Sequence, residues 1–168
     1  MNKYDHHFNG NEWFVIIALI FGILVVYFLP WRFPKQIAIV FVGCGIFFGF
    51  FFDQTLSVLP VSFYDIGDTS HFEVIDFLSQ CMYGPYSYLF FYLYDRLTIS
   101  PRFSPIYILV WTFISTGFEK VADMIGVFHY KHGYNIYFSF VLYLGVLSIW
   151  VMFYYFLKAY GHKQFKSS

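Results

Sequence analysis

Residues 136–157 read IYFSFVLYLGVLSIWVMFYYFL, which is a run of 22 residues without a charged side chain. A helix needs about 20 mainly apolar residues to cross a hydrocarbon core about 30 Å thick. The run therefore predicts a membrane-spanning helix, and four further stretches approach the same length. These stretches cover residues 13–29, 37–52, 75–94 and 105–128. We predict an all-α protein, an integral membrane bundle of about five transmembrane helices that forms one membrane domain over residues 1–168.

The composition agrees with this fold class. The 168 residues are 59% hydrophobic and only 12% charged, whereas an ordinary soluble domain is about a quarter charged. Ten basic and ten acidic residues cancel, so the overall charge gives no reason to expect a nucleic-acid partner. The lipid bilayer is the partner that this composition predicts.

The basic residues predict the orientation of the chain, because short loops rich in Lys and Arg stay on the cytoplasmic side. With the N-terminus outside, seven of the ten basic residues fall on cytoplasmic pieces, and only Lys3 and Lys131 fall on outer ones. The seven are Arg32, Lys35, Arg96, Arg102, Lys158, Lys163 and Lys166. We therefore expect a multi-pass protein of the plasma membrane with its N-terminus outside and its C-terminus in the cytoplasm.

Polar side chains gather on one face of the fourth predicted span, where Glu119 and Asp123 continue a stripe of Thr and Ser residues. The third span carries a matching face. Because a short loop joins the two spans, we expect them to be antiparallel neighbours whose polar halves meet at one depth. The predicted intramembrane cluster consists of Asp76, Gln80, Tyr83, Glu119, Lys120 and Asp123.

Two interpretations of this cluster remain open. Buried polar groups that tie helices together explain it structurally, with Lys120 neutralising one acid. A proton site or a divalent-cation site explains it functionally, since ionisable residues inside membranes usually serve a function. Carboxylate oxygens suit Mg²⁺, Mn²⁺ or Ca²⁺, so a divalent cation is the candidate cofactor. Its candidate ligands are Asp76, Glu119, Asp123 and His129.

Gly43, Gly45 and Gly49 give the second span a face of small residues that is suited to close helix packing. The sequence leaves the partner of this face open. It lies within the chain, in a second copy of the chain, or in another membrane protein.

Several short motifs resemble those of a family of small, uncharacterised multi-pass membrane proteins from spore-forming Bacillus and Clostridium relatives. The motifs are Tyr64-Asp65-x-x-Asp68, Tyr83-Gly-Pro-x-x-Tyr88-Leu-Phe, Tyr94-Asp95, Trp111-x-x-x-Ser115-x-x-Phe118-Glu119, Gly126-Val-Phe-x-Tyr130 and Tyr137-x-Ser139. The resemblance implies a bacterial plasma-membrane protein, and it brings no established activity, ligand or catalytic residue with it.

We expect an accessory or interaction role in the cell envelope rather than an enzyme. No Ser/His/Asp arrangement, phosphate-binding loop or metalloprotease helix is present in the sequence. The alternatives are a proton- or cation-coupled transporter and a membrane-embedded enzyme that acts on lipid. Either would use Asp76, Glu119 and Asp123.

Overall fold

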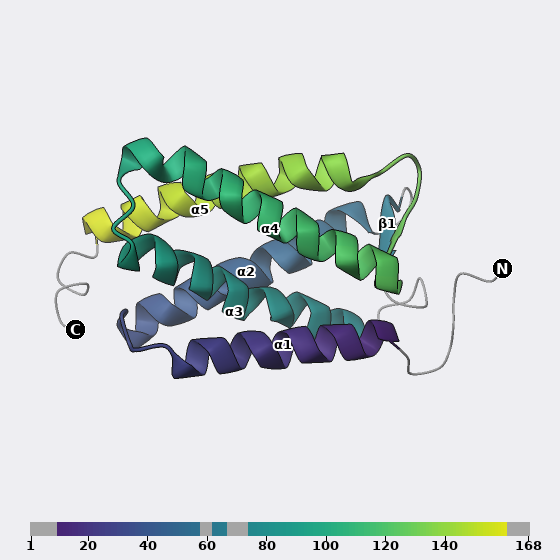
Figure 1. Cartoon of the computed structure of the whole chain (residues 1–168), viewed down its shortest axis with the longest axis horizontal. Helices are drawn as coiled ribbons and strands as arrows, with labels where there is room; N and C mark the ends of the chain where they lie inside the picture. The colour runs from purple at the N-terminus through teal and green to yellow at the C-terminus, as the bar shows by residue number, and fades with distance from the viewer. Residues whose placement is uncertain (1–9, 58–61, 67–73, 161–168) are drawn as a thin grey trace.

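A computed structural model describes residues 10–57, 62–66 and 74–160, without the side chains of residues 65 and 66. These residues form the five predicted helices, so the prediction of a helical bundle is confirmed (Figure 1). The helices are α1 (Gly10–Phe28), α2 (Lys35–Leu56), α3 (Val74–Arg96), α4 (Ser104–Ile125) and α5 (Ile136–Tyr160). A short 3₁₀ helix, η1 (Pro101–Phe103), precedes α4, and two strands, β1 (Tyr64–Ile66) and β2 (Phe128–Tyr130), pair antiparallel. Lys163, Lys166 and Asp68 lie outside the described residues.

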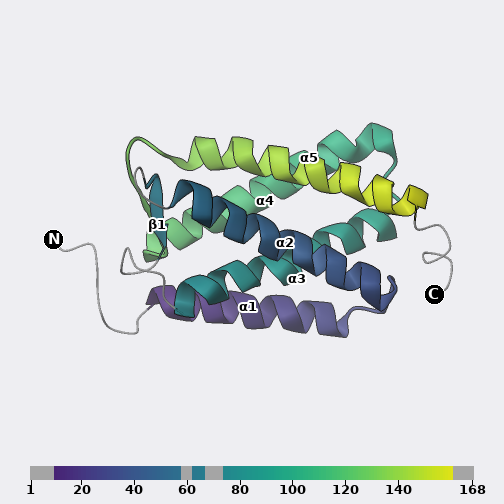
Figure 2. The same cartoon turned by 180° about the vertical axis from the view of Figure 1, so that it is seen from behind.

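The bundle has two halves. Helix α3 packs against α1 and α2, while α4 packs against α5, and Figures 1 and 2 show these groups from opposite sides. The helices alternate in direction, so the α1–α2 and α3–α4 connections lie at one end together with the end of α5. We call this the basic end, because Arg32, Lys35, Arg96, Arg102 and Lys158 lie there. The opposite end carries β1 and β2, and we call it the sheet end.

Helices α1, α2 and α5 are each long and apolar enough to cross a membrane. Their outward faces remain apolar, as Ile17, Phe47 and Met152 illustrate with exposed fractions of 60%, 61% and 72%. A contiguous apolar exterior of this kind marks a surface that contacts lipid or another protein. Gln80 of α3 and Thr112 and Glu119 of α4 are instead buried inside the bundle.

The helix ends differ from the predicted spans at two places on the sheet end. Helix α2 continues to Leu56, so Asp53 belongs to the helix and not to the following loop. Helix α4 stops at Ile125 because Gly126 adopts a left-handed conformation with φ of 92° and donates its N–H to Ala122 and Asp123 carbonyls. Of the residues predicted to finish this span, Gly126 and Val127 form a turn and only Phe128 belongs to β2. The sheet is an element that the sequence did not predict.

Glycines bring α2 and α3 into close contact. A Cβ atom at Gly45 would lie 2.2 Å from the Tyr83 carbonyl oxygen, and one at Gly49 would lie 2.8 Å from the Tyr83 ring. From the other side, a Cβ atom at Gly84 would lie 2.9 Å from Val42. The partner of the predicted glycine face is thus α3 of the same chain. Gly43 does not take part, because it is exposed and has open space beside it.

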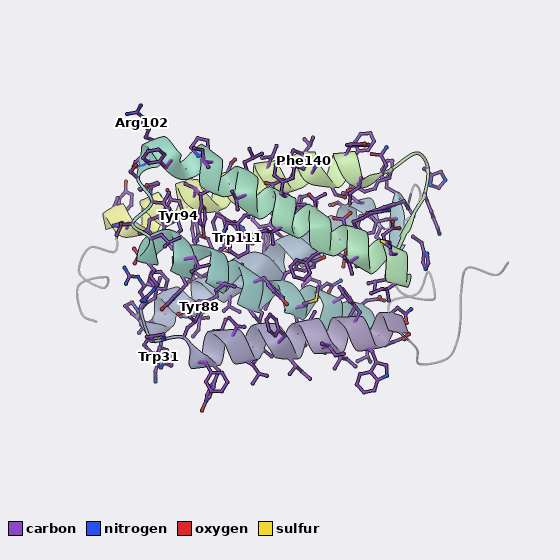
Figure 3. All side chains as sticks on the ribbon, in the orientation of Figure 1. Trp31, Tyr88, Tyr94, Arg102, Trp111 and Phe140 are labelled. Carbon is purple, nitrogen blue, oxygen red and sulfur yellow. The ribbon has the colours of Figure 1, made fainter. Side chains whose placement is uncertain are left out.

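At the basic end, an ionic network around Asp95 joins α3 to the α1–α2 connection and to α5. Arg32, from the α1–α2 connection, donates Nε to the Asp95 carboxylate and Nη2 to the Asp95 backbone carbonyl (3.1 Å). The Tyr154 hydroxyl of α5 donates to the same carboxylate, and Lys158 Nζ lies 3.9 Å from it. In Figure 3, Trp31 and Arg102 project outward from this end.

An aromatic cluster fills the bundle just inside the basic end. Phe41 and Phe91 stack with ring centroids 3.9 Å apart, and the Phe91 ring lies 5.6 Å from that of Trp150. Tyr94 and Tyr154 meet edge to face at 5.0 Å. All five side chains are buried, so the cluster joins α2, α3 and α5. On its outer side, Tyr94 and Tyr154 line a second cavity of about 320 Å³ at the basic end.

We predict that Gly45→Ala lowers the free energy of unfolding by about 1–3 kcal/mol, because the new methyl group collides with the α3 backbone. Gly43→Ala is the matched control on the same helix. It should be neutral or stabilise the protein by about 0.5–1 kcal/mol through helix propensity. Unfolding by SDS in mixed micelles measures both. Equal effects of the two substitutions would mean that α2 and α3 do not meet at Gly45.

Candidate functional site: a central cavity with two buried carboxylates

A cavity of about 340 Å³ lies between the two halves of the bundle, and all five helices contribute to its wall. Most of the wall is aromatic or aliphatic. Trp111 of α4 is one of its rings and contacts Phe90 of α3, with centroids 5.7 Å apart (Figure 3). Two charged residues line the cavity among the described residues, namely Asp53 and Glu119, and no Lys, Arg or His lines it there. The cavity is therefore apolar along most of its length and acidic toward the sheet end.

Asp53 is buried near the end of α2 and accepts hydrogen bonds from two other elements. The Gln80 side chain of α3 donates Nε2 to Asp53 Oδ2 at 2.6 Å. The Tyr64 hydroxyl of β1 donates to Asp53 Oδ1 at 3.0 Å. Gln80 is thus buried as predicted in a polar contact, but its partner is a residue that the sequence placed in a loop.

Glu119 of α4 is buried and accepts three hydrogen bonds. Tyr130 of β2 and Ser139 of α5 donate to Oε1 at 2.7 and 2.5 Å, and Tyr143 of α5 donates to Oε2 at 2.7 Å. All three donors are neutral hydroxyls. The predicted polar stripe of α4 therefore does turn inward at Glu119, where it faces α5 and β2.

The two strands bring these carboxylates to the same end of the cavity. Tyr64, which binds Asp53, is the direct cross-strand partner of Tyr130, which binds Glu119. Side chains directly opposite each other in an antiparallel pair lie on one face, with Cβ atoms about 4.5–5.5 Å apart. Burial raises the pKa of both Tyr64 and Tyr130 well above its ordinary value, and the neighbouring carboxylates act in the same direction. Both tyrosines therefore stay protonated as donors at neutral pH.

Tyr83 of α3 completes the acidic end. Its side chain lines the cavity and interacts electrostatically with both Asp53 and Glu119. Tyr83 thus lies in the same part of the cavity wall as Glu119, with which the sequence analysis grouped it. Asp53, Tyr83 and Glu119 thus surround one polar pocket that continues into the apolar cavity.

The other predicted site residues lie elsewhere. Lys120 and Asp123 form an ion pair of 2.6 Å on the outer side of α4, where the Lys120 side chain is 55% exposed. Asp76 is buried on α3, one turn before Gln80, and His129 lies on β2. None of these four residues lines the cavity.

The predicted metal site does not assemble in the described part of the chain. No group of three or more His, Cys, Asp and Glu residues lies there in a position to hold a metal ion. The physical reason is that Glu119 and Asp123 separate. Glu119 is satisfied by hydroxyls inside the bundle, whereas Asp123 pairs with Lys120 outside it.

Sequence reasoning missed Asp53, Tyr64, Tyr130, Ser139 and Tyr143 as site residues. A spacing of four residues, which places side chains on one helix face, could have indicated some of them. Asp53 follows Gly45 and Gly49 at intervals of four, so it continues the face that packs on α3. Ser139 and Tyr143 are also four residues apart and share one face of α5. Tyr64 and Tyr130 carry no such signal, because strands of three residues show no readable alternation.

We predict that Tyr143→Phe lowers the free energy of unfolding by about 1.5–3 kcal/mol, because it removes a buried hydrogen bond to a charged acceptor. Lys120→Met is the control on the neighbouring helix. It breaks an exposed ion pair and should change stability by less than about 1 kcal/mol. Thermal unfolding in detergent compares the two. A Tyr143→Phe protein as stable as the unaltered chain would show that Glu119 does not depend on this hydroxyl.

No family model, curated protein or solved structure matches the chain. The resemblance to small multi-pass proteins of spore-forming bacteria therefore stays a prediction from the short motifs. The arrangement of side chains around the cavity is the basis for a functional assignment.

Proposed function

We propose that this chain is a five-span protein of the bacterial plasma membrane that acts as an accessory binding protein and holds one amphipathic, lipid-derived molecule in its central cavity. The observation that carries the proposal is the cavity itself. Its volume of about 340 Å³ falls in the range of small-molecule sites, which are mainly apolar with a few convergent polar groups. The wall of rings and aliphatic chains suits a hydrocarbon tail, and the acidic end suits a polar head.

A lateral opening between α1 and α4 supports access from the bilayer. Phe21, Ile114 and Phe118 line the cavity, yet they are 57%, 43% and 53% exposed. The cavity therefore reaches the side of the bundle between these helices. The Tyr86 hydroxyl donates to the Ala18 carbonyl at 2.9 Å across α1 and α3, and the Tyr86 ring lies 6.3 Å from that of Phe118.

The charge distribution supports an orientation with the N-terminus outside. Five described basic residues lie at the basic end, and Lys131 lies on the connection at the sheet end. Short basic segments stay in the cytoplasm, so the sheet end and the acidic part of the cavity face the outer leaflet. Five helices that alternate in direction agree with this placement (Figure 1).

The separation of the central cavity from the basic end favours binding over transport. A transporter needs a pathway to both sides of the membrane. Among the described residues, however, the central cavity shares no lining residue with a second cavity of about 320 Å³ at the basic end, and the buried Phe91 lines neither of them. The acidic pair of Asp53 and Glu119 keeps a proton- or cation-coupled transporter as the second candidate. In that case the aromatic cluster has to move during each cycle.

We predict that Ser115→Phe abolishes binding, because Ser115 lines the cavity and a phenyl ring there occupies the space of the ligand. Gly117→Phe is the matched control, since Gly117 is exposed on the same helix with nothing within 4 Å of its Cβ position. Native mass spectrometry in mild detergent, with extraction and identification of bound lipids, measures occupancy. We expect the Ser115→Phe protein to lose at least about four-fifths of the bound molecule, and the Gly117→Phe protein to keep it.

The proposal fails if the unaltered protein carries no bound molecule after extraction from its native membrane. It fails equally if all three proteins carry the same molecules in the same amounts, because the cavity then plays no part in binding. Thermal unfolding of each variant separates lost binding from lost folding.

The orientation makes its own prediction. In a chain with Cys44 and Cys81 replaced by Ala, we expect a cysteine at His132 to react with a membrane-impermeant maleimide added to intact cells. A cysteine at Thr98 should react only after the membrane is opened. Both residues are exposed on connections at opposite ends of the bundle, so the pair tests sidedness directly, and reactivity of Thr98 in intact cells would reverse the topology.

A further inference from the structure

The acidic end of the cavity holds two carboxylates and no basic side chain among the described residues that line it. Removing a carboxylate from water costs several kcal/mol unless hydrogen bonds or an opposite charge compensate for the loss. Asp53 and Glu119 accept five hydrogen bonds in total, two and three respectively, and all come from neutral donors. Both carboxylates thus have hydrogen-bond donors, but no positive charge in the described cavity wall balances their negative charge.

Resting on the function proposed above, we infer that the bound molecule carries a protonated amine, which sits between Asp53 and Glu119 at the acidic end. An ammonium group offers three donors to oxygen acceptors. Glu119 Oε2 and both carboxylate oxygens of Asp53 each accept one hydrogen bond and retain the capacity for another. A primary alkylamine resembles the Lys side chain, whose pKa is about 10.4, so it is charged at neutral pH.

A second observation also points to a ligand. Trp150 of α5 is 8% exposed and lines the cavity, and its indole Nε1–H has no hydrogen-bond partner among the described residues. Leaving a buried donor unsatisfied costs about 1–3 kcal/mol. Trp150 follows Tyr143, which binds Glu119, by seven residues, so the two residues share a face of α5 about 10 Å apart along the helix. A molecule with its amine at Glu119 thus reaches Trp150 with an oxygen acceptor about 10 Å along its length.

The amine can come from a lipid or from a soluble compound, and the test separates these sources. Delipidated protein in mild detergent is titrated with dodecylamine, dodecanol, dodecanoate and butylamine, and native mass spectrometry gives the occupancy of each. We expect dodecylamine to bind at least tenfold more tightly than dodecanol, and dodecanoate to bind most weakly. Butylamine binding as tightly as dodecylamine would assign the site to a soluble amine.

Variants of the carboxylates make the test specific. Asp53→Asn and Glu119→Gln keep the size of each side chain while removing its charge. In the unaltered protein the Gln80 side-chain amide donates to the Asp53 carboxylate. In Asp53→Asn this amide can rotate by 180° and accept a hydrogen bond from the new Asn side chain instead. We expect each substitution to weaken dodecylamine at least fivefold and to leave dodecanol unchanged. Asp123→Asn is the control, because Asp123 lies in the outer ion pair with Lys120, and it should leave both affinities as they are.

The role of Trp150 is tested with 8-aminooctyl butyrate, an amine with an ester oxygen near the required distance. We expect this ester to bind more tightly than dodecylamine, and the difference to disappear in Trp150→Phe, which keeps a ring but lacks the N–H donor. An equal affinity of the two amines for the unaltered protein would overturn the assignment of an acceptor at Trp150.

The outcomes distinguish the two proposals. Equal binding of dodecylamine, dodecanol and dodecanoate, blocked by Ser115→Phe, leaves the cavity as a lipid site and overturns the amine. Preference for dodecanoate overturns the amine as well. Binding of none of the four compounds, or binding that Ser115→Phe does not reduce, overturns the proposed function together with the inference.

Discussion

A buried carboxylate in a membrane bundle has to find its hydrogen-bond donors within the protein, and this constraint organises the sheet end of the molecule. Asp53 and Glu119 belong to different halves of the bundle, and each draws donors from elements distant in the sequence. The tyrosines that serve them, Tyr64 and Tyr130, are partners in the two-stranded sheet. Strands of three residues each therefore connect the halves through their acids, and their rings also pack against Val15 of α1 and Ala122 of α4.

Helix α3 separates the rigid part of the molecule from the hollow part. Toward α2 it presents Gly84 and the backbone of Tyr83, where glycines on the opposite helix permit contact too close for any side chain. Its Tyr83 and Tyr86 rings line the cavity, although Tyr83 also abuts Gly49 of α2 and Tyr86 also bonds to Ala18 of α1. The tight contact has no room for a ligand, while the large rings on the other face leave unfilled volume between the halves. One helix thus provides both the support and the wall of the site.

The sequence predicted the five helices because long apolar runs are the strongest signal that a membrane imposes. It also placed Gln80, Tyr83 and Glu119 in one polar region, since wheel positions and an antiparallel pair are enough for that. It also placed Lys120 and Asp123 in this region, whereas the two residues pair with each other on the outer side of α4. Asp53 was missed because the end of its helix was placed at residue 52 and not at Leu56, and the tyrosine donors depend on strand pairing that only tertiary structure reveals.

The two ends of the bundle differ in charge and in whether the central cavity extends to them. This difference bears on what the protein can do. At the basic end, Arg32 and Tyr154 converge on Asp95 beside a small second cavity, and an aromatic cluster separates this cavity from the central one. At the sheet end, two acids face an open cavity without a basic residue in its described wall. An ammonium group entering between α1 and α4 is drawn toward these acids, and the low dielectric of the bundle strengthens that attraction. Because the central cavity shares no described lining residue with the cavity at the basic end, our proposal has the molecule leave by the side through which it entered. Reversible capture of this kind suits a binding protein, whereas a transporter has to release its cargo on the far side.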